Sequence, residues 1–267
     1  MDSRWFRRFG QPGDPGPAGR SGASLAGGPE ADAVRLICFP HAGGSAGAYL
    51  PLTRVLAPRL DVVAVQYPGR QDRRREPGVA DITELARLVA ERLTATSSDS
   101  RPYAFFGHSM GALLAYETAR ALRDRQAPAP VRLFLSARGA PSTAPNPHDS
   151  LPDDTAILAA VRALGGTGAA VLDDPELVAM ALPALRADYR ALASYTWRPG
   201  DPLDTPFSVL CGLDDPVVGT AEAARWGEHT RAGSDLTLLP GGHFYLDQRL
   251  GDVAELILRG VRTAVTR

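Results

Sequence analysis

The chain has 267 residues, 44% of them hydrophobic, and its 29 basic and 30 acidic residues leave a formal net charge of -1. This composition is that of an ordinary soluble globular protein, and it lacks the excess of positive charge typical of nucleic-acid-binding domains. All 29 basic residues are arginine, which excludes chemistry that needs a lysine, such as a pyridoxal phosphate Schiff base or a phosphate-binding P-loop.

The N-terminal segment is polar and rich in glycine and proline. Residues 10–30 hold seven glycines and four prolines, a composition that predicts a mobile arm within an N-terminal segment spanning residues 1–32. We expect a single domain at 33–267. No apolar stretch resembles a secretory signal or a membrane span, so we expect a cytoplasmic protein, and a monomer. Cys38 and Cys211 lie in apolar runs and are predicted to be buried thiols, not ligands of a metal.

From residue 33 onward, short apolar runs alternate with amphipathic helical patterns. Continuous apolar strands separated by helices predict a mostly parallel sheet with helices on both faces, which is an α/β fold. The helix after Asp81 is the clearest, because Asp81 and Glu84 form a capping pattern. Strands are predicted at 34–39, 62–66, 103–106, 131–135, 207–211 and 235–239, and further helices at about 48–56, 111–125, 220–229 and 251–265.

The motif G-x-S-x-G occurs twice, at 43–47 and at 107–111. A nucleophilic serine in this motif occupies a sharp turn that needs a strand directly before it and a helix directly after it. Ser109 meets both conditions, because the apolar run PYAFF leads into Gly107 and the helical pattern GALLAYETARAL follows. Ser45 meets neither condition, since several loop residues separate it from its strand. The sequence therefore predicts Ser109 as the nucleophile of an α/β-hydrolase fold.

About seventy residues separate the strand ending near Leu135 from the strand starting near Phe207, far more than an ordinary connection between strand and helix. One helix is predicted from Thr155 to Leu164, ended by two glycines, and another from Asp174-Pro175, interrupted by Pro183. We expect this insertion, at about 145–200, to form a helical lid over the carboxyl edge of the sheet. A purely structural subdomain is the alternative.

A serine nucleophile needs a base to remove its proton, and in this fold the partners follow in the order serine, acid, histidine. Three histidines come late enough in the chain, namely His148, His229 and His243. His243 follows the last predicted strand on a glycine-rich loop, whereas His229 lies on a helix and His148 at the start of the lid. We therefore predict His243 as the base.

The acid is expected just beyond the strand before that one, where two aspartates are adjacent. Asp215 is favoured because Pro216 follows it and shapes a loop that aims one carboxylate at His243. Asp214 remains the alternative.

An oxyanion hole in this fold takes one amide from the residue after the nucleophile and one from a loop that follows an early strand. Met110 is the first donor. The loop Pro40-His41-Ala42-Gly43-Gly44 is rich in glycine, as expected where a backbone approaches a ligand closely, and we assign Ala42 as the second donor. Ala42 as an ordinary small loop residue is the alternative.

Six segments in order resemble one family: FPHAGGSAGAY, VVAVQYPGRQDRRRE, YAFFGHSMGALLAYETA, ALPALRADYRA, CGLDDPVV and LPGGHFYL. Together they resemble the stand-alone type II thioesterases of polyketide and non-ribosomal peptide biosynthesis, over nearly the whole chain apart from the insert at 10–30. The resemblance implies hydrolysis of acyl groups from the phosphopantetheine arm of an acyl or peptidyl carrier protein, editing stalled or misprimed chains without a cofactor. It matches Ser109, Asp215 and His243 to the triad, and Ala42 and Met110 to the oxyanion donors.

Arg70 and the run Arg73-Arg74-Arg75 form a candidate docking patch for an acidic carrier protein, with a solvated loop as the alternative.

Two other functions for the whole protein stay open. A general carboxylesterase or lipase would use the same triad on free esters, and a catalytically silent binding protein would keep only the scaffold.

Overall fold

The computed structural model describes residues 2–9, 34–57, 59–95, 101–143, 145–166 and 172–265, so the predicted arm at 10–30 lies outside the described residues. Within them, one seven-stranded sheet has the order β1-β3-β2-β4-β5-β6-β7, in which β1 is antiparallel to β3 and the other neighbours are parallel. The strands are β1 (Phe6–Arg7), β2 (Arg35–Phe39), β3 (Asp61–Val65), β4 (Tyr103–His108), β5 (Leu133–Ser136), β6 (Phe207–Gly212) and β7 (Ser234–Leu239). The predicted α/β fold is confirmed.

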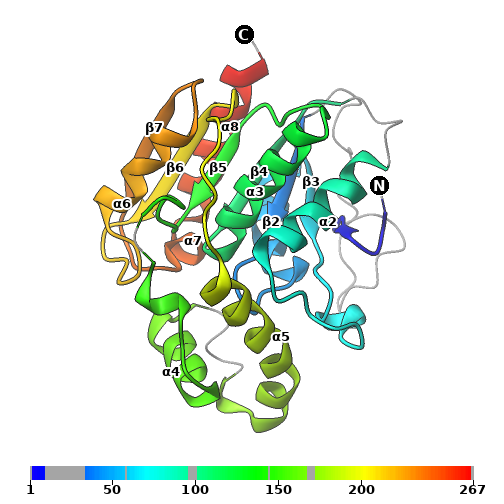
Figure 1. The fold of residues 1–267 in the computed structure, drawn as a ribbon. Helices are drawn as coiled ribbons and strands as arrows, with labels where there is room; N and C mark the ends of the chain where they lie inside the picture. The colour runs from blue at the N-terminus through cyan, green and yellow to red at the C-terminus, as the bar shows by residue number, and fades with distance from the viewer. Residues whose placement is uncertain are drawn as a thin grey trace.

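Helices cover both faces of the sheet (Figure 1). Helices α1 (Leu50–Leu56) and α8 (Leu250–Val265) pack on one face, and α2 (Ile82–Thr94) and α3 (Met110–Asp124) on the other. Side chains alternate along each strand, so Ile37 joins the core under α2 and α3 while Cys38 joins the core under α1 and α8. The predicted cap of α2 is confirmed, because the Asp81 carboxylate accepts the amide hydrogen of Glu84 at 2.8 Å.

The predicted start of the domain near residue 33 is wrong in one respect. Phe6 and Arg7 form β1 and pair with Val65 and Ala64 at the edge of the sheet, and the Trp5 and Phe6 side chains are buried. A strand of two residues is too short to show an alternating pattern, so the sequence carries no signal for it.

The long insertion contains η3 (Pro147–Asp149), α4 (Asp154–Leu164) and α5 (Pro175–Ser194), and α4 and α5 lie beyond the edge of the sheet where the strands end (Figure 1). The predicted interruption at Pro183 is wrong, because α5 continues through it. Pro183 removes one backbone hydrogen bond, but burial of Leu185, Tyr189 and Leu192 holds the helix against the rest of the protein.

Three short helices lie in the connections after β6 and β7. The predicted helix at 220–229 is split into α6 (Thr220–Ala224) and the 3-10 helix η5 (Arg225–His229), and α7 (Tyr245–Gln248) precedes α8.

Cys38 and Cys211 are buried free thiols, as predicted, and burial raises the pKa of the Cys211 thiol to about 11. Among the described helices, none has both the length and the apolar character needed to cross a bilayer.

Candidate active site

Ser109 occupies the sharp turn between β4 and α3. Its φ of 56° and ψ of -120° are a strained combination for a residue with a side chain. A Cβ on Gly107 would lie 2.1 Å from the carbonyl oxygen of Gly111, and one on Gly111 would lie 1.9 Å from that of Phe39. Both glycines are therefore required by backbone contact. Ser45 has an extended backbone, with φ -122° and ψ 173°, and sits in no such turn.

Three side chains predicted to act together are in hydrogen-bonding contact. His243 Nε2 lies 3.0 Å from Ser109 Oγ, and His243 Nδ1 lies 3.0 Å and 3.1 Å from the two carboxylate oxygens of Asp215. The His243 and Asp215 side chains are 2% and 0% exposed. Asp214 is exposed, and its amide donates to the carbonyl of Gly241. The geometry thus favours Asp215 over Asp214, while the catalytic roles stay a prediction.

Asp215 and His243 meet because β6 and β7 are parallel neighbours that end at the same edge. The loops after these strands touch, since a Cβ on Gly212 would lie 2.5 Å from the carbonyl oxygens of Gly241 and Gly242. Asp215 Oδ1 also accepts the amide hydrogen of Val217 at 2.9 Å, across Pro216. This local turn holds the carboxylate toward the imidazole, as expected from the proline.

Two further histidines, His41 and His108, lie near His243. The ring centroid of His108 lies 5.3 Å from that of His243, and His41 stacks edge-on against Phe244. Burial, reinforced by His243 and Arg70, lowers the pKa of His41 to about 4, and burial lowers the pKa of His108 well below its usual range. Both rings are therefore neutral at pH 7, so neither opposes a positive charge forming on His243.

The predicted oxyanion donors lie beside Ser109. Met110 is the first residue of α3, a position whose amide has no partner within its helix. Ala42 lines the same cavity as Ser109 and His243. Among the described residues, the Ala42 amide donates no hydrogen bond, whereas the next amide, that of Gly43, donates to Asp188 at 2.7 Å. These features are compatible with an oxyanion hole, whose assignment stays a prediction.

The cavity at Ser109 has a volume of about 140 Å³ and a largely apolar wall. Part of the wall comes from the strand ends and part from α4 and α5. Its residues are His41, Ala42, Gly43, Ser109, Val161, Leu164, Gly165, Leu172, Ala181, Leu185, Tyr189, His243 and Phe244. The insertion therefore supplies mostly apolar side chains to the wall of the cavity at Ser109.

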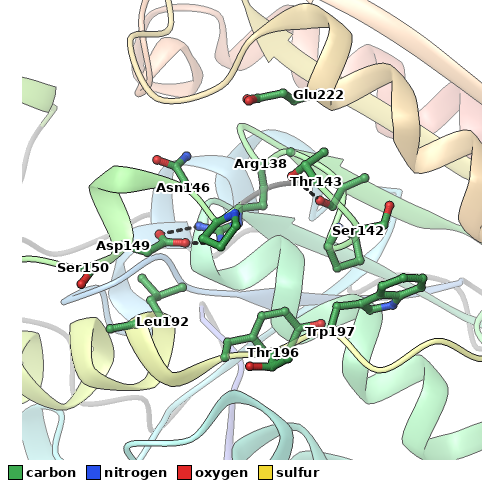
Figure 2. A pocket seen from close by; sticks show the side chains of 16 residues that line it. Arg138, Ser142, Thr143, Asn146, Asp149, Ser150, Leu192, Thr196, Trp197 and Glu222 are labelled. Carbon is green, nitrogen blue, oxygen red and sulfur yellow. Dashed lines mark hydrogen bonds and ion pairs between the residues drawn. The ribbon is translucent and has the colours of Figure 1, made fainter.

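A larger cavity of about 390 Å³ lies between the loop after β5 and the end of α5. Figure 2 shows its polar wall, where the Arg138 guanidinium contacts the Asp149 carboxylate, and Trp197 on the opposite side. None of its lining residues belongs to the Ser109–His243–Asp215 group. The smaller cavity, by contrast, is lined by Ser109 and His243.

The predicted docking patch is wrong for two of its four arginines. Arg70 and Arg73 are 4% and 6% exposed, and they pair with Asp188 and with Glu76. Their charges are used inside the chain, so they are not available to a partner. Arg74 and Arg75 are exposed, and their part in docking stays a prediction.

Asp188, on α5, is a buried acid that the sequence-based prediction missed. The residues three and four positions away on either side, Ala184, Leu185, Ala191 and Leu192, are all apolar and buried. A single carboxylate in an apolar helical stripe is the signal that identifies a buried, paired charge.

Comparison with known proteins gives a consistent result. The family model described as "Thioesterase domain" matches residues 34–260. The chain is 50% identical to the "Probable cadicidin biosynthesis thioesterase" of Streptomyces griseus over 94% of its length, and it spans 64% of that protein. It is 42% identical to "Thioesterase PikA5" of Streptomyces venezuelae, covering 87% of this chain and 84% of that one.

Among solved structures, the chain resembles the type II thioesterase BorB from the borrelidin biosynthetic cluster. The TM-score is 0.81 and the identity 43%, with 96% of this chain and 97% of that chain covered. It also resembles the thioesterase RedJ of the prodiginine pathway in Streptomyces coelicolor, with a TM-score of 0.77, 39% identity, and 88% and 91% of the two chains covered.

Proposed function

Since the chain belongs to the thioesterase family, we propose that it hydrolyses acyl thioesters held on the phosphopantetheine arm of carrier proteins, and so removes stalled or misprimed chains in polyketide or non-ribosomal peptide synthesis. Its relatives carry names from such pathways. The observation that carries the proposal is the 3.0 Å contact between Ser109 Oγ and His243 Nε2 at an apolar cavity.

The reaction uses an acyl-enzyme intermediate. Ser109 Oγ attacks the thioester carbonyl while His243 Nε2 takes the hydroxyl proton, and Asp215 holds the imidazole in the tautomer that can accept it. The amides of Ala42 and Met110 stabilise the oxyanion, each by about 2.7 to 4 kcal/mol in the transition state. The C–S bond then breaks and the pantetheine sulfur receives the proton from His243.

Water completes the cycle by the same route. His243 removes a proton from water, which attacks the Ser109 ester, and the second tetrahedral intermediate collapses to the free acid and the serine hydroxyl. The neutral rings of His41 and His108 leave His243 able to carry the proton in both steps. Every atom needed comes from the chain, the thioester and one water molecule.

A comparison of substrates tests this function. We expect kcat/KM for acyl chains loaded on a carrier protein to exceed kcat/KM for soluble esters of the same acids by at least about tenfold, because carrier contacts add binding energy. Equal or higher values on soluble esters would instead indicate a general carboxylesterase. A binding protein without activity would leave Ser109 unlabelled by a fluorophosphonate.

The apolar cavity is proposed to hold the acyl group, so filling it should alter chain-length selection. Ala181→Leu adds hydrocarbon to a space of about 140 Å³. We expect kcat/KM for the longest accepted acyl chain to fall about tenfold or more relative to the acetyl group, since each methylene in such a pocket changes binding measurably. Ala179→Leu, at an exposed site on the same helix, is the matched control. An unchanged ratio of the two substrates would place the acyl group elsewhere.

Arg74 and Arg75 are the part of the predicted docking patch that remains exposed. We expect their joint replacement by glutamate to lower kcat/KM on an acyl carrier protein about tenfold at low salt and less at high salt, because exposed charges steer an acidic partner and are screened. Soluble-ester hydrolysis should not change. Arg54→Glu with Arg59→Glu gives the same change in net charge at another exposed site, and an equal loss there would reject specific docking.

A further inference from the structure

Helix α5 contacts the loop that carries Ala42 directly. The Asp188 carboxylate accepts the Gly43 amide hydrogen at 2.7 Å, and the Leu185 side chain packs so closely that a Cβ on Gly43 would lie 2.5 Å from it. Gly43 has a φ of +74°, which a glycine adopts without strain. The conformation of this loop therefore depends on where α5 lies.

Arg70 completes the contact from the other side. Its guanidinium binds the Asp188 carboxylate, and its Nε donates to the carbonyl of Gly44 at 3.2 Å. A third bond goes from Nη1 to the carbonyl of Pro68 at 3.1 Å. The Arg70–Asp188 pair thus holds an amide and a carbonyl of the two residues that follow Ala42.

Stability alone does not explain this pair. Arg70 is 4% exposed and Asp188 is 1% exposed, and burial works against ionisation of the carboxyl, raising the pKa of Asp188. A buried ion pair is often no more stabilising than apolar side chains of similar volume, because both charges lose their hydration. What apolar side chains cannot supply is an acceptor for the Gly43 amide and a donor for the Gly44 carbonyl.

We propose that the Arg70–Asp188 pair is a positioning device that aims the Ala42 amide at the oxyanion and makes the oxyanion hole depend on the placement of α5. This inference rests on the proposed function, in which Ala42 is an oxyanion donor. Neither side chain touches the substrate. Their effect is exerted through the backbone of residues 42–44, next to Ser109 in the wall of the same cavity.

Displacing the Ala42 amide should lower kcat much more than it changes KM. Losing an oxyanion donor lowers kcat by about 10² to 10³, and a displaced donor loses part of that stabilisation. Disrupting the pair should therefore lower kcat about 10-fold to 100-fold and leave KM within about threefold, because the neutral carbonyl of bound substrate depends less on the donor than the oxyanion does.

A matched pair of double variants isolates the contact to Gly43. Arg70→Met with Asp188→Leu removes both charges and the acceptor, whereas Arg70→Met with Asp188→Asn removes both charges but keeps an oxygen for the Gly43 amide. We expect the leucine variant to show the full loss in kcat and the asparagine variant to recover most of it, with thermal midpoints close to each other. Arg186→Ala with Asp154→Ala removes an exposed ion pair between α5 and α4 and controls for general loosening of these helices.

Three readouts distinguish positioning from a merely structural role. Affinity for an alkyl boronic acid, whose adduct with Ser109 places an oxygen in the oxyanion hole, should fall in parallel with kcat. Affinity for the product acid should not change. The rate of Ser109 labelling by a fluorophosphonate should fall as well, and this readout needs no carrier substrate, so it separates failure of this inference from failure of the proposed function.

Equal kcat values for the two double variants, or a folded leucine variant with wild-type kcat, would overturn the proposal. If the leucine variant does not fold, Arg70→Met with Asp188→Ala decides the question, because alanine removes the acceptor of the Gly43 amide hydrogen without adding volume. Its kcat should lie at least about fivefold below that of Arg70→Met with Asp188→Asn, with KM nearly unchanged. Wild-type kcat in that folded variant would equally overturn the proposal.

Discussion

Replacing Ser109 with alanine is expected to lower hydrolysis of an acyl carrier protein by about 10⁶-fold in kcat, because the covalent intermediate cannot form and the triad acts as a unit. The remaining activity would come from the oxyanion donors acting on direct attack by water. Mass spectrometry of a panel of carrier proteins loaded with different acyl groups measures the loss, since each hydrolysed chain leaves the free phosphopantetheine form with a defined mass difference.

Ser45→Ala is the matched control for this experiment, because Ser45 occupies the other G-x-S-x-G segment but has an extended backbone immediately before a 3-10 helix. It should retain near wild-type kcat. Substantial turnover by Ser109→Ala, or covalent labelling of Ser45 in the wild-type protein, would contradict the assignment of the nucleophile. The Ser109→Ala protein should also fold normally, since alanine removes only one hydroxyl group from the turn.

Asp215→Asn is expected to lower kcat by about 10⁴-fold. The carboxylate lies within 3.1 Å of His243 Nδ1 through both oxygens, and an amide in its place permits the wrong tautomer of the imidazole. The loss should appear in kcat on carrier-bound and soluble substrates alike, because tautomer and orientation act on the chemical step. A thermal melt checks that the variant keeps its fold, since asparagine has nearly the same volume.

The neighbouring aspartate provides the control. Asp214→Asn alters an exposed carboxylate one residue away, while the contact between Asp214 and Gly241 uses the backbone amide and is preserved. We expect its kcat within about threefold of wild type. A larger loss for Asp214→Asn than for Asp215→Asn would assign the acid to Asp214, which the sequence alone left open.

Much of the fold follows from local patterns. The six predicted strands correspond to β2 to β7, each within two residues of its predicted ends, because continuous apolar runs between helices are the pattern of a buried parallel sheet. Proximity of Ser109 and His243 was also predictable, since parallel strands end at one edge and both residues follow such ends. Three features of the fold escaped this reasoning, namely the two-residue strand β1, the continuity of α5 through Pro183, and the division of the predicted helix at 220–229 into α6 and η5.

The strand, turn and helix around Ser109 are encoded locally, because the two glycines required by backbone contact, Gly107 and Gly111, lie directly between an apolar strand and a helical pattern. Which charged side chains face solvent depends instead on long-range packing. Arg73 and Arg74 are adjacent in a basic run, yet Arg73 is buried against Glu76 and Arg74 is exposed. Arg70 pairs with Asp188 across 118 positions, and no local pattern encodes such a partner. A buried arginine needs an opposite charge to offset its lost hydration, and that charge can come from an element far away in the chain.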